Sequence, residues 1–518
     1  MPRGPKRRRR WAATGRLAGI AGISVIFAGC TVGPDYVRPD APVPVAYKEA
    51  WKPAPPEKGW RQARPADAID RGAWWSIYRD PVLDHLEREI DISNQNLKAA
   101  EAAYREAEAT VAAARAQFFP TASINASDTR TRTSGNGGRT TFGAGTITNQ
   151  YRTQASASWV PDLWGSVART VEGDVASAQA SAATLANVRL SAQGTLATAY
   201  VELRTADELA RLLAASVKAF AQALQIVKSQ FAGGTTDQSA VDQAQAQLDA
   251  TRAQLIATQV TRGQLEHSIA VLIGKPPAEL TIAPTYAMLS VPLIPGEFPA
   301  ALLERRPDVA AAERDVATAN AQIGVAAAAF YPTVTLSANY GVSAEMLRKL
   351  FTSASRIWSL GATAAETIFD GGARNAQLEH DKAAYDGTVA TYRQTVLAAF
   401  QQVEDEQLAQ RVLAEQAVAQ DSAVKAARSA EATIRNQYLA GTQAYTAVIV
   451  AENTALGDAE TALNVRQSRL VASVALIEAL GGGWDASQIP NQEQIESDVP
   501  LNFNPLPPTF PTPPDPKK

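Results

Sequence analysis

The chain has 518 residues and a formal net charge of −3, and its composition, with 3 Met and 1 Cys, suits long and narrow helix packing better than a bulky globular core. Seven basic and no acidic residues lie within the first 30 positions, so the rest of the chain is acidic and nucleic-acid binding is not expected. Because the three histidines are scattered and no catalytic cluster is visible, we predict no metal site, no cofactor and no enzymatic activity.

The N-terminus has the three parts of an export signal. A basic segment precedes the apolar stretch 17–28, which is too short to span a bilayer as a mature helix, and Ala28 and Gly29 stand directly before Cys30. We interpret residues 1–29 as a lipoprotein signal peptide and Cys30 as the acylated residue, with a chance thiol in a signal segment as the alternative.

Residues 30–90 are interpreted as the acylated leader and the start of an equatorial region. Prolines recur in the leader at positions 34, 39, 42, 44, 53, 55 and 56. Because proline excludes helix, we expect an extended strap along the protein surface, followed by a short helix near Trp74-Trp75 and Asp80-Pro81.

Four segments alternate between apolar and polar residues with the two-residue period of a strand: about 120–132, 150–160, 332–343 and 356–368. Each is close to the nine to eleven residues, roughly, that cross a membrane as a tilted strand. Two hairpins in a soluble sheet are the alternative.

Aromatic residues gather at the ends of these segments, where a membrane-interface girdle would lie. They are Phe118, Phe119, Tyr151, Trp159, Tyr331, Trp358 and Phe369.

The segments 165–231 and 371–439 contain no proline and predict helices on the order of 100 Å long. Return helices are expected over 237–273 and 445–480, with small residues at heptad seam positions that let helices approach closely. A soluble coiled coil would show the same seam.

The chain is also duplicated. The sequence AQFFPTASINAS at 116–127 corresponds to AAFYPTVTLSAN at 328–339. A period of about 210 residues is a duplicated half rather than a solenoid unit. We therefore divide the chain into a first repeat, 91–290, a second repeat, 298–484, and a proline-rich C-terminal tail, 485–518, which its composition predicts to be disordered.

Four membrane strands cannot close a barrel, and an open edge in lipid leaves backbone groups unpaired. Three copies would supply twelve strands with a wet interior, because one face of every segment carries Ser, Thr, Asn or Gln. The expected fold is thus a mixed α and β membrane protein: a trimeric twelve-stranded β-barrel, continued by a long α-helical coiled-coil barrel.

The motifs CTVGPDY at 30–36, FFPT and FYPT, DLWG at 162–165 and IFDGG at 368–372 resemble the TolC-like outer-membrane efflux channels, and more narrowly their lipoprotein branch of the OprM/NodT type. The resemblance covers residues 30 to about 484. It implies a homotrimer in the outer membrane, lipid-anchored at Cys30, with its helices in the periplasm. It also implies docking to a periplasmic membrane-fusion adaptor and an inner-membrane pump of the resistance-nodulation-division type.

The resemblance further implies that the periplasmic hairpin tips form the gate and contact the adaptor. The candidates are Gly233, Gly234, Thr235, Asp237, Asp242, Gly441, Thr442, Tyr445 and Glu452. A helix N-cap is the alternative for Asp237 and a solvated face for Asp242. The chain has Val450 where the family often has Asp, so the family's gate residues cannot be transferred directly.

We therefore expect a passive exit duct of a tripartite efflux system for drugs and other small molecules. Export of proteins by type I secretion, and a lipid-anchored trimeric structural protein or adhesin, are the alternatives.

Overall fold

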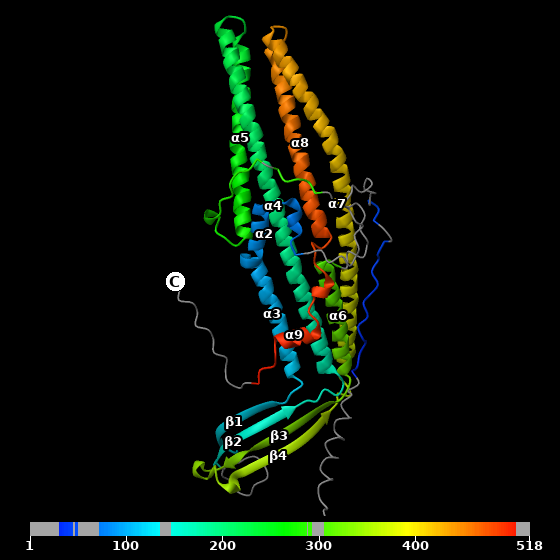
Figure 1. Ribbon diagram of the computed structural model, residues 1–518. Helices are drawn as coiled ribbons and strands as arrows, with labels where there is room; N and C mark the ends of the chain where they lie inside the picture. The colour runs from blue at the N-terminus through cyan, green and yellow to red at the C-terminus, as the bar shows by residue number, and fades with distance from the viewer. Residues whose placement is uncertain are drawn as a thin grey trace, which may run out of the picture.

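The computed structural model describes residues 31–44, 47–49, 72–134, 147–286, 288–292 and 305–503. The predicted signal peptide, Cys30 and the last part of the tail lie outside the described residues. The molecule is elongated, with a sheet at one end and the tips of two helical hairpins at the other (Figure 1).

The helices are α2 (Pro81–Ser93), α3 (Gln95–Ala116), α4 (Ser166–Ala232), α5 (Gln238–Leu272), α6 (Pro307–Ala328), α7 (Ala373–Leu439), α8 (Tyr445–Ala479) and α9 (Gln492–Asp498). The strands are β1 (Thr121–Arg132), β2 (Ile147–Trp159), β3 (Thr333–Ala344) and β4 (Arg356–Ala365). Short 3-10 helices are η1 (Trp74–Tyr78), η2 (Pro277–Glu279), η4 (Leu347–Lys349), η5 (Ser353–Ser355) and η6 (Ala486–Gln488).

The two halves have the same construction. Helices α3 and α6 have 22 residues each, α4 and α7 have 67, and α5 and α8 have 35. In each half a strand pair stands between the first helix and the long one. The predicted duplication is therefore confirmed.

All four strands form one antiparallel sheet in the order β1-β2-β3-β4. In the rows that start at residues 121–124 of β1, the register places apolar residues across from apolar residues, and polar residues across from polar residues or glycine; toward the far end, Thr153, Asp128 and Arg356 also stand in apolar rows. One row joins Ile124, Ala155, Tyr340 and Trp358, and the adjacent row joins Ser123, Ser156, Asn339 and Ser359. The sheet thus has one apolar and one polar face, as the alternation predicts.

The long helices pack side by side away from the sheet, α4 against α5 and α6, and α7 against α6 and α8. The seam residues Ala244, Thr251 and Thr258 are buried, which lets α5 approach its neighbours closely. A large apolar cluster lies near the middle of the molecule, where Leu83 and Ile90 of α2 pack with residues of α4, α5 and α8.

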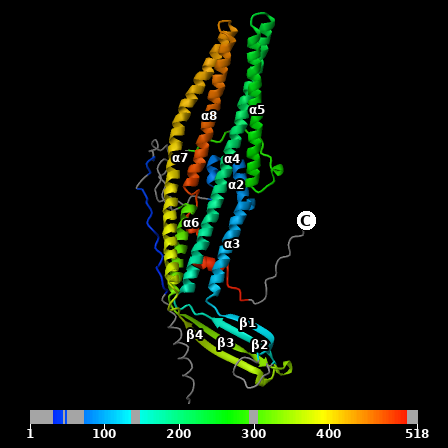
Figure 2. The same cartoon turned by 180° about the vertical axis from the view of Figure 1, so that it is seen from behind.

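The leader runs as an extended strap along the outside of α6 and α7, as predicted for residues 31–44 (Figure 2). The Tyr36 hydroxyl donates to Glu313, and Arg38 Nε donates to the Tyr392 hydroxyl at 3.1 Å. These contacts attach the leader to both helices.

The prediction of a disordered tail is wrong for residues 486–498, which contain η6 and α9. Helix α9 begins with a capping box in which Asn491 and Gln494 exchange hydrogen bonds, and Ile495 is buried against α3 and α4. Arg115 of α3 pairs with Glu496 at 3.2 Å. Composition alone does not predict α9, because the helix is short, has one buried apolar residue and lies in a proline-rich segment.

Candidate functional site

The polar face of the sheet carries side-chain hydrogen bonds between each pair of neighbouring strands. The hydroxyls of Ser123 and Ser156 are 2.8 Å apart, the Gln154 amide donates to Asn339 Oδ1 at 2.6 Å, and Asn339 donates to the Ser359 hydroxyl at 3.1 Å. These contacts cross all four strands. A surface of exposed hydroxyls and amides is suited to water and not to hydrocarbon.

The opposite face presents bare apolar side chains. Ile124, Leu360 and Trp358 are each more than 70% exposed. No helix of the described chain covers this face, since the sheet extends beyond the ends of the helices (Figures 1 and 2). A large exposed apolar surface beside a polar one is typical of a strand that separates lipid from water.

Strands β1 and β4 are the two edges of the sheet, and within the described chain each pairs on one side only. Their outward backbone groups would be unpaired in a membrane, which costs several kcal/mol per group, roughly.

The predicted girdle residues lie at two levels of the sheet. Five are at the end next to the helices: Phe118, Phe119, Trp159, Tyr331 and Phe369. Tyr151 and Trp358 lie toward the far end, on the apolar face. From Trp159 to Tyr151 the strand rises about 26 Å, or about 20 Å of height at a 40° tilt, which is comparable with an apolar band of about 25 Å.

At the other end of the molecule, the two hairpins turn with the same geometry. Gly234 and Gly441 have φ of 72° and 73°, with nothing within 4 Å of an added Cβ, so backbone conformation alone requires glycine. The hydroxyls of Thr235 and Thr442 each donate to a helix-end carbonyl at 3.0 Å. Gly233, the third glycine of the tips, has φ of −82°, a conformation that other residues also adopt.

The two acidic tip residues have different surroundings. Asp237 is the N-cap of α5: its carboxylate accepts from the Ser239 hydroxyl at 2.7 Å and the Ala240 amide at 3.0 Å, which holds its pKa below the usual value. Asp242 is exposed and accepts from the Gln238 side chain at 2.8 Å. Asp237 thus acts as a helix N-cap, whereas the Asp242 carboxylate is exposed on α5 and caps no helix terminus.

Tyr445 and Glu452 lie inside the helical layer rather than at its surface. Glu452 is 3% exposed and pairs with Arg435 of α7 at 2.9 Å, and burial raises its pKa. Tyr445 packs on Tyr438, whose hydroxyl donates to Gln230 of α4. Tyr438 and Tyr445 therefore join the two hairpins within one chain, whereas Glu452 joins α8 to α7 within the second hairpin.

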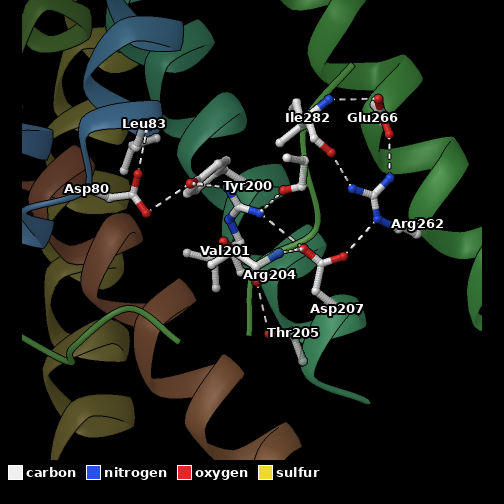
Figure 3. Close-up of polar contacts among 12 residues, drawn as sticks. Asp80, Leu83, Tyr200, Val201, Arg204, Thr205, Asp207, Arg262, Glu266 and Ile282 are labelled. Atoms are coloured by element: carbon white, nitrogen blue, oxygen red, sulfur yellow. Dashed lines mark hydrogen bonds and ion pairs between the residues drawn. The ribbon is translucent and has the colours of Figure 1, made fainter. Parts of the chain in front are cut away.

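A buried ionic network near the middle of the molecule was not foreseen from the sequence (Figure 3). Asp207 accepts from Arg204 at 3.1 Å and from Arg262 at 2.7 Å, and Arg204 donates to the Ala283 carbonyl at 2.9 Å. Glu266 accepts from the Ile282 amide at 2.9 Å. The network fastens the segment after α5 to α4 and α5. Its partners are up to 79 residues apart in the sequence, so no local pattern reveals it.

A second missed contact fixes the start of the leader. The buried Arg169 donates from Nε to the Val32 carbonyl and from Nη2 to Gly33 O, each at 3.2 Å, and pairs with Asp35 at 3.0 Å. Gly33 has φ of 105°, and a Cβ there would lie 2.5 Å from Gly324 Cα. Only glycine fits this close approach.

Among the described residues, no group of three His, Cys, Asp or Glu side chains is arranged to hold a metal ion. The candidate functional features are therefore surfaces: the polar face and the apolar face of the sheet, its two edge strands, and the two hairpin tips that turn at glycine.

Comparison with known proteins gives a consistent result. The sequence model of outer membrane efflux proteins matches residues 88–275 and 298–482. The chain is 28% identical over 488 residues to the probable efflux pump outer membrane protein TtgC of Pseudomonas putida, covering 93% of this chain and 99% of that protein. It is 30% identical over 448 residues to the pyoverdine export outer membrane protein OpmQ of Pseudomonas aeruginosa, covering 84% and 94%.

Among solved structures, the outer-membrane channel OprN has a TM-score of 0.79 and 29% identity, covering 88% of this chain and 100% of that one. The predicted fold class and outer-membrane location are confirmed. The chain belongs to the outer membrane efflux protein family and is an outer-membrane exit channel of an efflux system.

Proposed function

We propose that three copies of the chain close one twelve-stranded barrel and form a passive duct for small molecules. The observation that carries this proposal is the sheet itself, with a polar and an apolar face and two unpaired edges. Four strands enclose nothing, whereas twelve leave a lumen. The polar rows then line the lumen, the apolar rows face lipid, and the two levels of aromatic residues form the girdle.

The transported compounds in this proposal are small. Relatives are named for export of toluene, solvents, antibiotics and pyoverdine. The duct hydrolyses nothing, and it receives substrate from a periplasmic membrane-fusion adaptor and an inner-membrane pump of the resistance-nodulation-division type. In a strain lacking the gene, new sensitivity to small toxic compounds is expected. Loss of a secreted protein without such sensitivity would favour type I secretion instead.

A lipid anchor at Cys30 is part of the proposal. The support is the position of Thr31, which lies against Gly165 beside the sheet: a Cβ on Gly165 would be 2.8 Å from Thr31 Cα. The leader is therefore attached at the membrane end of the helices. Mass spectrometry of the mature N-terminus, with a Cys30→Ser control, tests the anchor; an unmodified Cys30 would contradict it.

The gate is proposed at the hairpin tips, at the nine candidate residues named from the sequence. Asp242 is exposed there, and threefold symmetry would repeat it as an acidic ring that attracts cations. Conductance of Asp237→Ala and Asp242→Ala trimers in planar bilayers tests the ring. Reduced cation selectivity is expected, mainly for Asp242→Ala. Unchanged cation selectivity in both variants would contradict the acidic ring.

Two neighbouring residues of β3 test the duct most sharply. Ala338 is on the apolar face and Asn339 on the polar face. Ala338→Arg places a charge in lipid at a cost of about 2–4 kcal/mol per protomer at mid-membrane, so trimer assembly should fall. Asn339→Arg should assemble normally and shift the pore current toward anions. The reverse pattern would contradict the proposed faces.

A further inference from the structure

Three arginines lie on the apolar face of the sheet at its far end. Arg130 and Arg132 of β1 continue the row of alternate residues that includes Ile124, and Arg356 of β4 lies opposite Val342 on the same face. All three are exposed. Within the described chain none of them pairs with a carboxylate, and the undescribed segment 135–146 contains no Asp or Glu.

Aromatic residues mark the depth of these arginines. Tyr340 and Trp358 lie opposite each other on the apolar face, and Trp358 is two residues after Arg356, the first residue of β4. Arg356 is thus about 7 Å beyond Trp358. Aromatic side chains on a barrel's outer face sit at the membrane interface, so the arginines reach the layer of lipid headgroups just outside it.

The stagger of the sheet brings the arginines of neighbouring copies together. Thr121, at the helix end of β1, traces across the sheet to Gly361, which is four residues (365 − 361) from the helix end of β4. A line drawn across the strands therefore moves about four residues away from the helices between β1 and β4. One more strand spacing, onto β1 of the next protomer, increases this offset to about five residues, and we call this offset the stagger.

This stagger decides what Arg356 meets at the seam between protomers. Arg356 traces back through Val342 and Thr153 to Ala126 of its own β1. About five residues further along β1 of the next copy are Arg130 and Arg132, on the same outward face. The closed barrel therefore has three seams, each with three outward arginines.

The charge balance around the cluster is positive. Asp128 of β1 and Glu345, after β3, are the nearby acids, while Arg348 and Lys349 add positive charge from the turn between β3 and β4. Guanidinium groups without carboxylate partners bind phosphate oxygens well, often through two parallel hydrogen bonds.

From this juxtaposition we propose that Arg130 and Arg132 of one protomer and Arg356 of the next form a binding site, at each seam, for the phosphate groups of an anionic lipid in the outer leaflet. The proposal rests on the trimeric barrel proposed above. The bound lipid would bridge two protomers at the edges that each chain leaves open. Arginines here are then ligands for lipid headgroups rather than charges exposed to hydrocarbon.

The test uses purified full-length trimers in detergent, titrated with lipid A, a diphosphorylated glycolipid, and followed by native mass spectrometry. The variant is Arg130→Gln with Arg132→Gln and Arg356→Gln. Each basic residue near an anionic surface strengthens binding roughly fivefold, so we expect the affinity for lipid A to fall on the order of a hundredfold in the triple variant. Arg152→Gln is the matched control, because Arg152 is near the same end of β2 but on the polar face.

Unchanged lipid A affinity in the triple variant, an equal loss in Arg152→Gln, or equally tight binding of dephosphorylated lipid A would overturn the proposal. Displacement by millimolar inorganic phosphate would also do so, by showing a general anion site. Trimers and pore current should persist in the triple variant. If the unsubstituted protein itself formed no trimers and carried no pore current, the trimeric duct would be contradicted instead.

Discussion

Glu87 of α2 permits a quantitative test of the buried electrostatics. Its side chain is 0% exposed, and neither carboxylate oxygen has a hydrogen-bond partner among the described residues. Burial, followed by the nearby carboxylates of Asp91 and Asp84, raises its pKa from 4.5 to about 9. Glu87 is therefore protonated in the folded protein at pH 7, whereas it ionises in the unfolded chain.

The sign of the pH dependence follows from linkage. A carboxyl group with a higher pKa in the folded state binds more protons there, so its contribution to stability is complete below pH 4.5 and is lost as pH rises to about 9. The loss is about 1.4 kcal/mol per pH unit, and thus about 3 kcal/mol per protomer at pH 7.

Glu87→Gln keeps the shape of the side chain and removes its ionisation. We expect the melting temperature of the variant, relative to the unsubstituted protein, to rise by several degrees between pH 5 and pH 8. Any packing change independent of pH cancels in this comparison. Thermal unfolding of detergent-solubilised protein, followed by tryptophan fluorescence, is the assay. Glu106→Gln, an exposed position on α3, controls for the loss of one carboxylate.

If the melting temperatures of Glu87→Gln and the unsubstituted protein change in parallel with pH, the predicted protonation of Glu87 is wrong. This result would mean that Glu87 is ionised in the folded state, with a partner or with water, and that its burial is incomplete.

The remaining predictions concern the tips and the tail. Gly234→Ala should destabilise the protein by about 1 kcal/mol, because alanine is strained at the positive φ of this turn. Gly457→Ala lies in a helix interior with open space around it and should stabilise the protein by a similar amount. Thermal unfolding measures both effects, and equal effects would contradict the backbone argument. Arg435→Ala should cost about 2 kcal/mol, because it leaves the buried Glu452 unpaired, and adding Glu452→Gln should recover part of this; additive losses would argue against the pair. Ile495→Asp should release α9, seen as faster hydrogen exchange over 490–503 with the trimer intact; unchanged protection would show that α9 is held by its polar contacts alone.

The repeated elements were predictable because their signals are local. Alternation of small and polar residues in 121–127 and 333–340 defines strands and also their faces, since a face is fixed once the period is two. Proline-free segments similarly define α4 and α7 to within two residues at each end. The Gly-Thr pairs at 234–235 and 441–442 likewise indicate the turns at the hairpin tips.

The contacts that fix these elements to one another were not predictable. Arg169 reads in sequence as an ordinary charged helix residue, yet it holds a leader 134 to 137 residues away. Asp207 reads as a solvated acid and is buried between two arginines. Burial depends on which helix faces meet, and periodicity alone does not specify that.

The tail shows the opposite error, in which composition suppressed a local signal. Asn491 and Gln494 form a capping box three residues apart, a pattern that predicts a helix start. The surrounding prolines led to a prediction of disorder. A capping box with an apolar residue at position 495 should have outweighed them.

A disulfide between the two edges of the sheet tests directly whether three chains close one barrel. Within one chain β1 and β4 are three strand spacings apart, about 14 Å, whereas a disulfide needs Cα atoms within about 7 Å. Only neighbouring protomers can therefore join Ser359→Cys of β4 to Ser127→Cys or Thr129→Cys of β1, and the chain's single native cysteine gives little background. We predict that oxidation of at least one pair yields covalent dimers and trimers on a denaturing gel, and nothing larger. Monomers only, in both pairings, or a ladder extending beyond three chains, would contradict a closed trimeric barrel.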